Sequence, residues 1–180
     1  MATITISGLP NSGKSTTADI LGKLIGYKRY YTGGIFREMA AERHMTIDEF
    51  YPTVDAATEQ EVDRRQEEHL RNENNIIVEG RIAPFLASEK KKIKLFFTVS
   101  QKESITRERR RNEKCRAMSD GALWKIISGR IDAERAHYRK LYPHIADHLD
   151  PSAFDIIIDT TEVSKYDVLL KVLKEIITEI

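Results

Sequence analysis

The stretch Gly8-Leu9-Pro10-Asn11-Ser12-Gly13-Lys14-Ser15 decides the fold, because it matches in full the pattern G-x-x-x-x-G-K-[S/T] of a phosphate-binding loop. It follows the β-branched run Thr3 to Ser7 directly and opens a helical pattern, which is the context this motif requires. Glycines at both ends let the backbone turn its N–H groups inward, and the helix start adds the positive end of its dipole. The sequence therefore predicts a site for the phosphates of a nucleotide.

The loop assigns a role to each of its polar side chains. We expect the Lys14 ammonium to reach the β- and γ-phosphates, the Ser15 hydroxyl to ligate Mg²⁺, and Thr16 to lie near the α-phosphate. ATP and Mg²⁺ are the donor and the cofactor that this arrangement predicts. The predicted ATP-binding residues are Gly8, Leu9, Pro10, Asn11, Ser12, Gly13, Lys14, Ser15 and Thr16.

Five short strand-like runs recur along the chain, at residues 3–7, 28–31, 75–79, 94–99 and 155–159, with helical patterns between them. This alternation predicts a three-layer α/β/α domain over residues 1–180, with a five-stranded parallel sheet. The last helix should cover the sheet through Tyr166, Leu169, Leu170, Leu173, Ile176, Ile177 and Ile180, which recur at helical spacing.

Two polar segments fit the layered scheme less well. Residues 46–71 form a helical stretch with few large apolar residues, so we expect it to lie over a cleft, as part of an acceptor-covering segment at about residues 33–72. Residues 107–119 are arginine-rich, and blocks of like charge are usually solvated and mobile. We predict that this second segment is a lid.

Composition excludes several classes of protein. The 180 residues include 29 Lys and Arg against 28 Asp and Glu, a net charge of +1, which argues against a surface built for nucleic acid or an anionic membrane. The single cysteine, Cys115, excludes an intramolecular disulfide framework and a cysteine-rich zinc site. With the phosphate loop so near the start, we expect no signal segment, and we predict a cytoplasmic monomer without a membrane or stable nucleic-acid partner.

Among phosphate-loop proteins, a small kinase fits the chain best. A switch GTPase needs a guanine-reading Asn-Lys-x-Asp segment, which the sequence lacks, and the chain is too short for a large motor or helicase ATPase. The segment Thr32-Gly33-Gly34-Ile35-Phe36-Arg37 resembles the nucleoside monophosphate kinases, which usually have Thr/Ser-Gly-Asp, two apolar residues and Arg there. The resemblance implies that Arg37 grips the acceptor phosphate, a task that suits a guanidinium. Gly34 replaces the customary aspartate.

Four further segments resemble the compact archaeal cytidylate kinases within that family, and the likeness covers nearly the whole chain. They are Asp63 to Gln66, Val78 to Arg81, Arg130 to Arg135 and Phe154 to Thr161. The resemblance implies transfer of the γ-phosphoryl group of ATP to CMP or dCMP. His137 stands where these kinases often have a further arginine.

The residues at the end of the third predicted strand support this placement. Glu79 ends the apolar run Ile76 to Val78, so its carboxylate is expected at the carboxyl edge of the sheet, where ligands bind in open α/β folds. There it can hold Mg²⁺ through water, together with Ser15. Arg81 is expected to face the acceptor phosphate at the same edge.

An acceptor phosphate is already anionic, so its attack needs no general base, and catalysis reduces to positioning and charge stabilisation. We expect Lys14, Arg107, Arg111 and Arg130 to surround the moving phosphoryl group. A cytosine pocket needs both hydrogen-bond donors and acceptors, a mixture that the acidic and basic residues near Asp63 and Glu134 can supply. The predicted acceptor-binding residues are Arg37, Asp63, Arg65, Arg81, Asp132 and Glu134.

Two alternatives stay open at this level. The first is a phosphate-loop kinase for AMP, UMP or a non-nucleotide alcohol, for which Asp63 can serve as the base. The second is a nucleotide-dependent module that holds RNA with the arginines of residues 107–116. This second alternative ranks low, because the tract has no interleaved aromatic residues on which bases stack.

Overall fold

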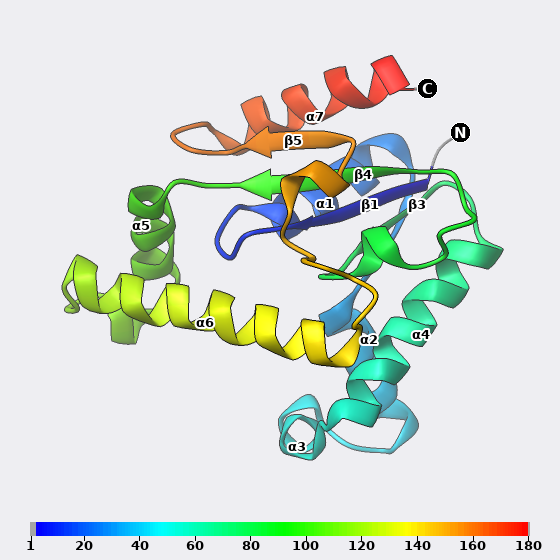
Figure 1. The fold of residues 1–180 in the computed structure, drawn as a ribbon, viewed down its shortest axis with the longest axis horizontal. Coiled ribbons are helices and arrows are strands. Elements are labelled where there is room, and N and C mark those ends of the chain that lie inside the picture. Colours follow the sequence, from blue (N-terminus) through cyan, green and yellow to red (C-terminus); the bar gives the residue numbers. More distant parts are fainter. Residues whose placement is uncertain (1–2, 180) are drawn as a thin grey trace.

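A five-stranded parallel sheet forms the centre of the computed structural model, which describes residues 3–179 (Figure 1). The strands lie in the order β2-β3-β1-β4-β5. Ile4 of β1 is in register with Ile77 of β3 on one side and Ile93 of β4 on the other. The strands are β1 (Thr3–Gly8), β2 (Lys28–Tyr31), β3 (Ile76–Glu79), β4 (Lys92–Thr98) and β5 (Ile156–Asp159). The predicted strands and three-layer fold class are confirmed.

Helices connect the strands and cover both faces of the sheet. The α-helices are α1 (Lys14–Ile25), α2 (Thr32–Glu42), α3 (Ile47–Phe50), α4 (Ala56–Asn72), α5 (Gln101–Arg111), α6 (Asp120–Leu141) and α7 (Lys165–Glu179). Short 3₁₀ turns are η1 (Tyr51–Thr53), η2 (Ala83–Phe85), η3 (Glu113–Cys115) and η4 (Pro151–Ala153). None of the helices within residues 3–179 has the length and apolar character needed to cross a membrane.

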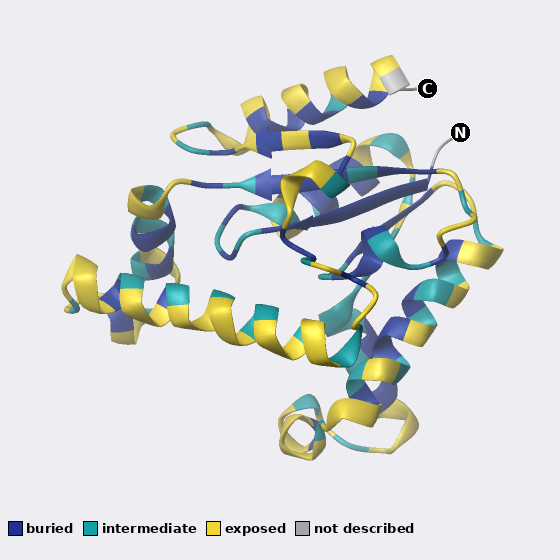
Figure 2. Ribbon diagram, in the orientation of Figure 1, coloured by how far each residue is buried: buried dark blue, intermediate teal, exposed yellow. Residues whose placement is uncertain are grey.

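The core is divided by the sheet, because successive side chains of a strand point to opposite faces. On one face, Ile4, Leu95 and Phe97 pack under α1 and α7. On the other face, Val78 packs with Leu70 of α4. Figure 2 shows that β1, at the centre, is buried along its described length, whereas α6 has a long exposed face. The buried sheet thus provides a rigid base for the loops at its carboxyl edge.

The helical stretch expected at residues 46–71 is present in the structure but is interrupted. The chain forms α3, then η1, and starts again as α4. Pro52 in η1 has no backbone N–H to continue a helix, and the Asp55 side chain accepts a hydrogen bond from the Thr58 N–H and so starts α4 as its N-cap.

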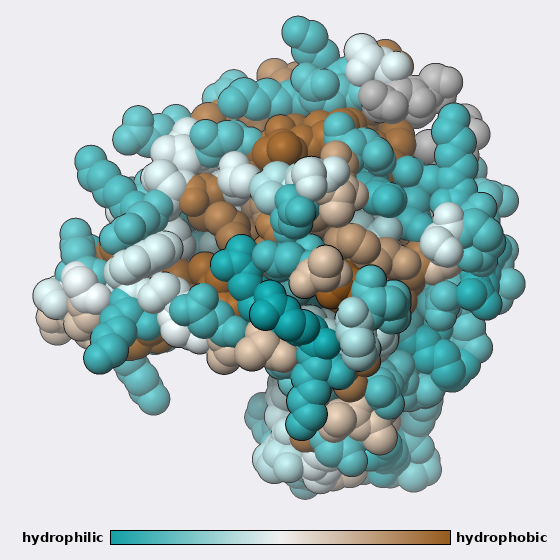
Figure 3. Space-filling view, viewed as in Figure 1, coloured by the Kyte–Doolittle hydropathy of each residue, from teal (hydrophilic) through white to brown (hydrophobic). Residues whose placement is uncertain are grey.

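The apolar face of α7 was only partly as expected. Leu169 and Ile176 are buried against the sheet, but Tyr166, Leu170 and Ile177 are 62%, 63% and 71% exposed. Below α7, Figure 3 shows apolar surface over the edge strand β5, where Ile157 is 53% exposed. Leu173 is partly buried against the same core, and Ile180 lies outside the described residues.

Gly8 connects the phosphate loop to the sheet, and a substitution at Gly8 tests this architecture. Its φ is +138°, and a Cβ there would overlap the backbone of Phe97 in β4. Gly8→Ala is therefore expected to lower the free energy of unfolding by ~3 kcal/mol or more. The control is Gly26→Ala, at φ +72° with nothing within 4 Å of the new methyl group, which should cost about 1 kcal/mol. Urea unfolding measures both, and equal losses would contradict the close approach of the loop to β4.

Candidate active site

A cavity of about 740 Å³ opens at the carboxyl edge of the sheet. Its floor is the phosphate loop, and α6 runs along one wall. Residues just after β1, β2 and β3 line this cavity. In open parallel sheets, ligands bind at the carboxyl ends of the strands, next to the point where the strand order changes direction. The lining residues are Pro10, Asn11, Ser12, Gly13, Lys14, Ser15, Thr16, Tyr31, Thr32, Gly33, Glu59, Glu79, Gly80, Arg81, Arg111, Arg130, Ala133, Glu134, His137 and Tyr138.

The phosphate loop has the geometry that an anion needs. Gly13, at φ +81°, is the N-cap of α1 and provides no side-chain cap, so the first N–H groups of the helix are left for a ligand. The Lys14 ammonium donates to the carbonyl oxygens of Gly8 at 2.9 Å and Leu9 at 2.6 Å. Burial, reinforced by the positive charge of Arg81, lowers the pKa of Lys14 to about 7. An anion bound at this position would stabilise the charged Lys14 ammonium and so oppose both the burial and the repulsion from Arg81.

Glu79 lies beside the loop as the sequence predicts. Its carboxylate accepts a hydrogen bond from the Ser15 hydroxyl at 2.5 Å and forms an ion pair with Arg29 of β2, also at 2.5 Å. Arg29 in turn stacks over the Tyr31 ring. The structure thus brings the two predicted Mg²⁺ ligands together, and Arg29 holds the carboxylate in place.

Arg81 connects the phosphate loop to α6. Its guanidinium donates to the Gly8 carbonyl at 2.9 Å and pairs with Glu134 at 2.9 Å. Glu134 also forms a hydrogen bond with the buried His148, with 3.3 Å between Glu134 Oε1 and His148 Nε2. Two of the six predicted acceptor residues, Arg81 and Glu134, are therefore neighbours in the main cavity.

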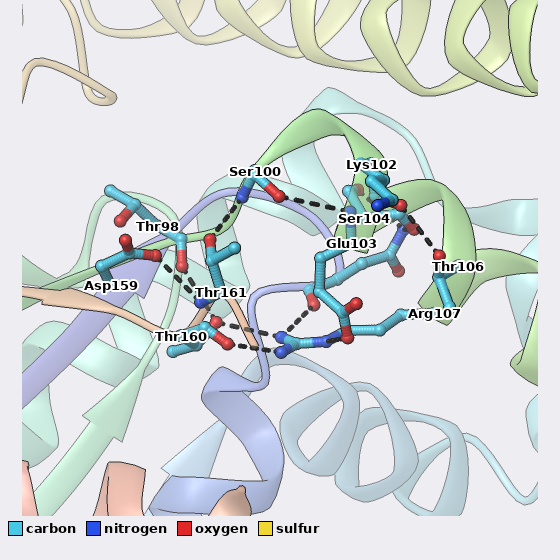
Figure 4. Close-up of polar contacts among 11 residues, drawn as sticks. Thr98, Ser100, Lys102, Glu103, Ser104, Thr106, Arg107, Asp159, Thr160 and Thr161 are labelled. Atoms are coloured by element: carbon cyan, nitrogen blue, oxygen red, sulfur yellow. Dashed lines mark hydrogen bonds and ion pairs between the residues drawn. The ribbon is translucent and has the colours of Figure 1, made fainter. Parts of the chain in front are cut away.

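Arg107 lies at a second cavity of about 280 Å³, on the other side of the phosphate loop. Its guanidinium donates to the Thr160 carbonyl at 2.6 Å, to the Thr160 hydroxyl at 2.9 Å and to the Asn11 carbonyl at 3.1 Å (Figure 4). The Nε of Arg107 donates to the Glu103 carboxylate at 2.9 Å. Among the predicted catalytic arginines, Arg111 and Arg130 line the main cavity, whereas Arg107 does not. A contact between Arg107 and the transferred phosphoryl group stays a prediction.

The segment expected to be a lid has a small apolar anchor. Cys115 is buried with Leu123 and Ile127 of α6. Arg111 and Arg116 are exposed, as a solvated charge block requires. The predicted lid therefore carries exposed arginines on a base that is fixed to α6.

The predicted acceptor residues away from Arg81 are more scattered. Arg37 is exposed and does not line the main cavity, but it donates at 2.9 Å to the carbonyl of Gly33, which does. Arg65 is paired with Glu42, and Asp132 is exposed on another face of α6. Neither residue lines the main cavity.

Asp63 is also outside the cavity lining, on the buried side of α4. It accepts a hydrogen bond from the Tyr142 hydroxyl at 2.8 Å. Burial raises the pKa of Asp63 to about 6, although the Tyr142 hydrogen bond acts in the opposite direction. The side chain therefore joins α4 to the end of α6.

Eight residues that line the cavity are not among the predicted site residues: Tyr31, Thr32, Gly33, Glu59, Gly80, Ala133, His137 and Tyr138. Glu59 comes from α4, and its carboxylate pairs with the His137 imidazole of α6 at 2.6 Å. Helical spacing was the signal that could have found Glu59 and His137, because Glu59 lies one turn before Asp63 and His137 one turn after Glu134.

Comparisons with known proteins find relatives over most of the chain. The family model described as an AAA domain matches residues 4–137. A cytidylate kinase of Methanococcus maripaludis (strain C7) is 36% identical over 167 residues, which cover 91% of this chain and 89% of the relative. The cytidylate kinase of Methanocaldococcus jannaschii is 35% identical over 168 residues, covering 92% and 90%.

Solved structures are similar in fold. A shikimate kinase from Bacteroides thetaiotaomicron aligns with a TM-score of 0.63 at 13% identity, over 97% of this chain and 98% of that chain. An uncharacterised protein from Eubacterium ventriosum aligns with a TM-score of 0.69 at 19% identity, over 98% of both chains.

The depressed pKa of Lys14 makes a prediction for ATP binding. At pH 8 the Lys14 amine of the free protein is largely neutral, and bound phosphates should raise its pKa, so binding takes up a proton. The affinity for ATP should therefore fall as pH rises above about 7, by up to about tenfold per pH unit. Calorimetry at pH 8 in two buffers of different ionisation enthalpy measures the uptake. Lys14→Met should abolish it, and equal uptake by this variant would contradict the assignment.

Proposed function

Because the chain belongs to the cytidylate kinase family, we propose that it transfers the γ-phosphoryl group of ATP to the phosphate of CMP or dCMP. The observation that carries the proposal is the contact between the Gly8 carbonyl and both Lys14 and Arg81. Lys14 belongs to the donor loop, whereas Arg81 reaches the loop from the end of β3. A donor phosphate and an acceptor phosphate bound to these two cations lie side by side.

The two cavities divide the substrates between them. The smaller cavity, at Arg107 and Thr160, receives the nucleoside part of ATP, and the phosphate chain follows the loop into the main cavity. The acceptor phosphate binds Arg81, with Arg37 beside Gly33. Arg111 and Arg130 enter from α5 and α6 and stabilise the negative charge of the moving phosphoryl group. Closure of the lid at residues 107–119 excludes water and limits ATP hydrolysis.

Mg²⁺ fits the residues present. Ser15 and Glu79 offer oxygen ligands 2.5 Å apart, and this hard cation prefers oxygen and usually keeps several waters. Among the described residues no group of three or more His, Cys, Asp or Glu could hold a metal alone, which agrees with an ion that binds together with the nucleotide. When bound, Mg²⁺ neutralises charge on the β- and γ-phosphates.

An alcohol acceptor is less well supported. An alcohol needs a general base within hydrogen-bond reach of its proton. Asp63, the candidate for that role, is bound to Tyr142 and lies outside the lining of the main cavity. An acceptor whose oxygen is already anionic needs no such group.

An acceptor screen tests the proposed function. With ATP as donor, CMP and dCMP should exceed UMP and AMP in kcat/KM by at least ~10-fold, or about 1.4 kcal/mol of differential transition-state binding. Lys14→Ala is the control, and it should lose turnover while its melting temperature stays close to that of the wild type. A clear preference for AMP would remove the cytidylate assignment and leave the phosphate-loop kinase.

A further inference from the structure

We propose that Glu59 reads the 4-amino group of the acceptor base, and that His137 is the positioning residue that holds the Glu59 carboxylate toward it. The inference rests on the proposed function, since it concerns the acceptor half of the main cavity. Glu59 of α4 and His137 of α6 pair at the end of the cavity away from the phosphate loop.

The position of the pair follows from the face of α6 that lines the cavity. Arg130, Glu134 and His137 recur there at helical spacing. Glu134 is fixed next to the phosphate loop, because it pairs with Arg81, which in turn donates to the Gly8 carbonyl. His137 lies about 4.5 Å farther along the helix axis than Glu134. Arg130, on the other side of Glu134, is assigned to the moving phosphoryl group, so an acceptor with its phosphate on Arg81 extends its base in the opposite direction along α6, toward His137.

Glu59 has the chemistry that an amino group requires. One carboxylate oxygen, Oε2, is bound to the His137 Nε2 at 2.6 Å. Within residues 3–179, no hydrogen bond engages the other oxygen, Oε1. The side chain is 39% exposed and lines the cavity, so Oε1 can accept from a ligand. An ionised carboxylate has no proton to donate, so it acts only as a hydrogen-bond acceptor.

This property separates cytosine from uracil. The group at position 4 of the pyrimidine lies farthest from the sugar, so a base anchored through its phosphate presents this group to the end of the cavity. Cytosine has an amino donor there, which matches the Glu59 carboxylate. Uracil has a carbonyl oxygen, which the carboxylate repels and leaves unpaired, and such a mismatch in a polar site discriminates strongly.

The surroundings fix the pair in place. Asp63 of α4 and Tyr142 at the end of α6 form a second link one turn away, at 2.8 Å. Two polar links thus set the spacing of α4 and α6 at this point. The Tyr138 ring lies beside His137, with ring centroids 5.4 Å apart, and lines the same cavity as an aromatic surface for the base.

The test compares CMP with UMP in the Glu59→Gln variant. An amide can either donate or accept, so this variant should lose the distinction, and the CMP to UMP ratio of kcat/KM should fall by at least ~10-fold. The matched control is Glu68→Gln, on the opposite face of the same helix, with a side chain that is 52% exposed and paired with Arg64. It should leave the ratio unchanged.

His137 is tested by the same ratio. His137→Ala removes the group that holds the carboxylate and should lower the CMP to UMP ratio about threefold or more. His137→Gln keeps an N–H donor at a similar reach and should restore the ratio. A ratio that is unchanged in His137→Ala would overturn the positioning role.

The outcomes separate this inference from the proposed function. If the wild type prefers CMP and Glu59→Gln keeps that preference, the inference is wrong and the proposed function stands. If the wild type does not prefer CMP, both fail. A CMP analogue with hydrogen in place of the 4-amino group tests the wild type alone, should a variant not fold. Use of this analogue as efficiently as CMP would also overturn the inference.

Discussion

The carbonyl oxygen of Gly8, at the end of the central strand, accepts hydrogen bonds from both the Lys14 ammonium and the Arg81 guanidinium, each at 2.9 Å. Two cations are thereby held near each other at a partly buried place, and the depressed pKa of Lys14 reflects the cost. The arrangement is stable only because backbone carbonyls and the Glu134 carboxylate surround it. Phosphate groups supply the negative charge that it otherwise lacks, so the site is organised before its ligand arrives.

The sheet explains why these groups meet. Gly8 ends β1, Glu79 ends β3, and both strands are parallel neighbours, so their carboxyl ends reach one edge. Gly8 also approaches the backbone of β4 so closely that a side chain there would not fit. The position of the phosphate loop is therefore set by the packing of the core, and the arginines of α5 and α6 are brought to it from outside the sheet.

The sequence was sufficient to predict the sheet and the place of the phosphate loop at its edge, because both depend on local signals. The phosphate loop is a contiguous motif, and Glu79 ends a continuous apolar run of the kind that forms a strand buried on both faces. The acceptor half could not be predicted in the same way. Glu59 and Asp63 lie one turn apart on the same face of α4, so which of them reaches the cavity depends on where α6 crosses that helix, and long-range contacts such as Glu59 to His137 determine this. The break at Pro52 also changed where α4 begins.

The central claim is that one site holds a donor and an acceptor with their phosphate chains end to end. Calorimetric binding of a single molecule in which adenosine and cytidine are joined through five phosphates tests this most directly. We expect one molecule bound per chain, at least ~100-fold more tightly than ATP, because one association event then makes the contacts of both substrates. Binding no tighter than that of ATP, or displacement of this molecule by ATP but not by CMP, would contradict it.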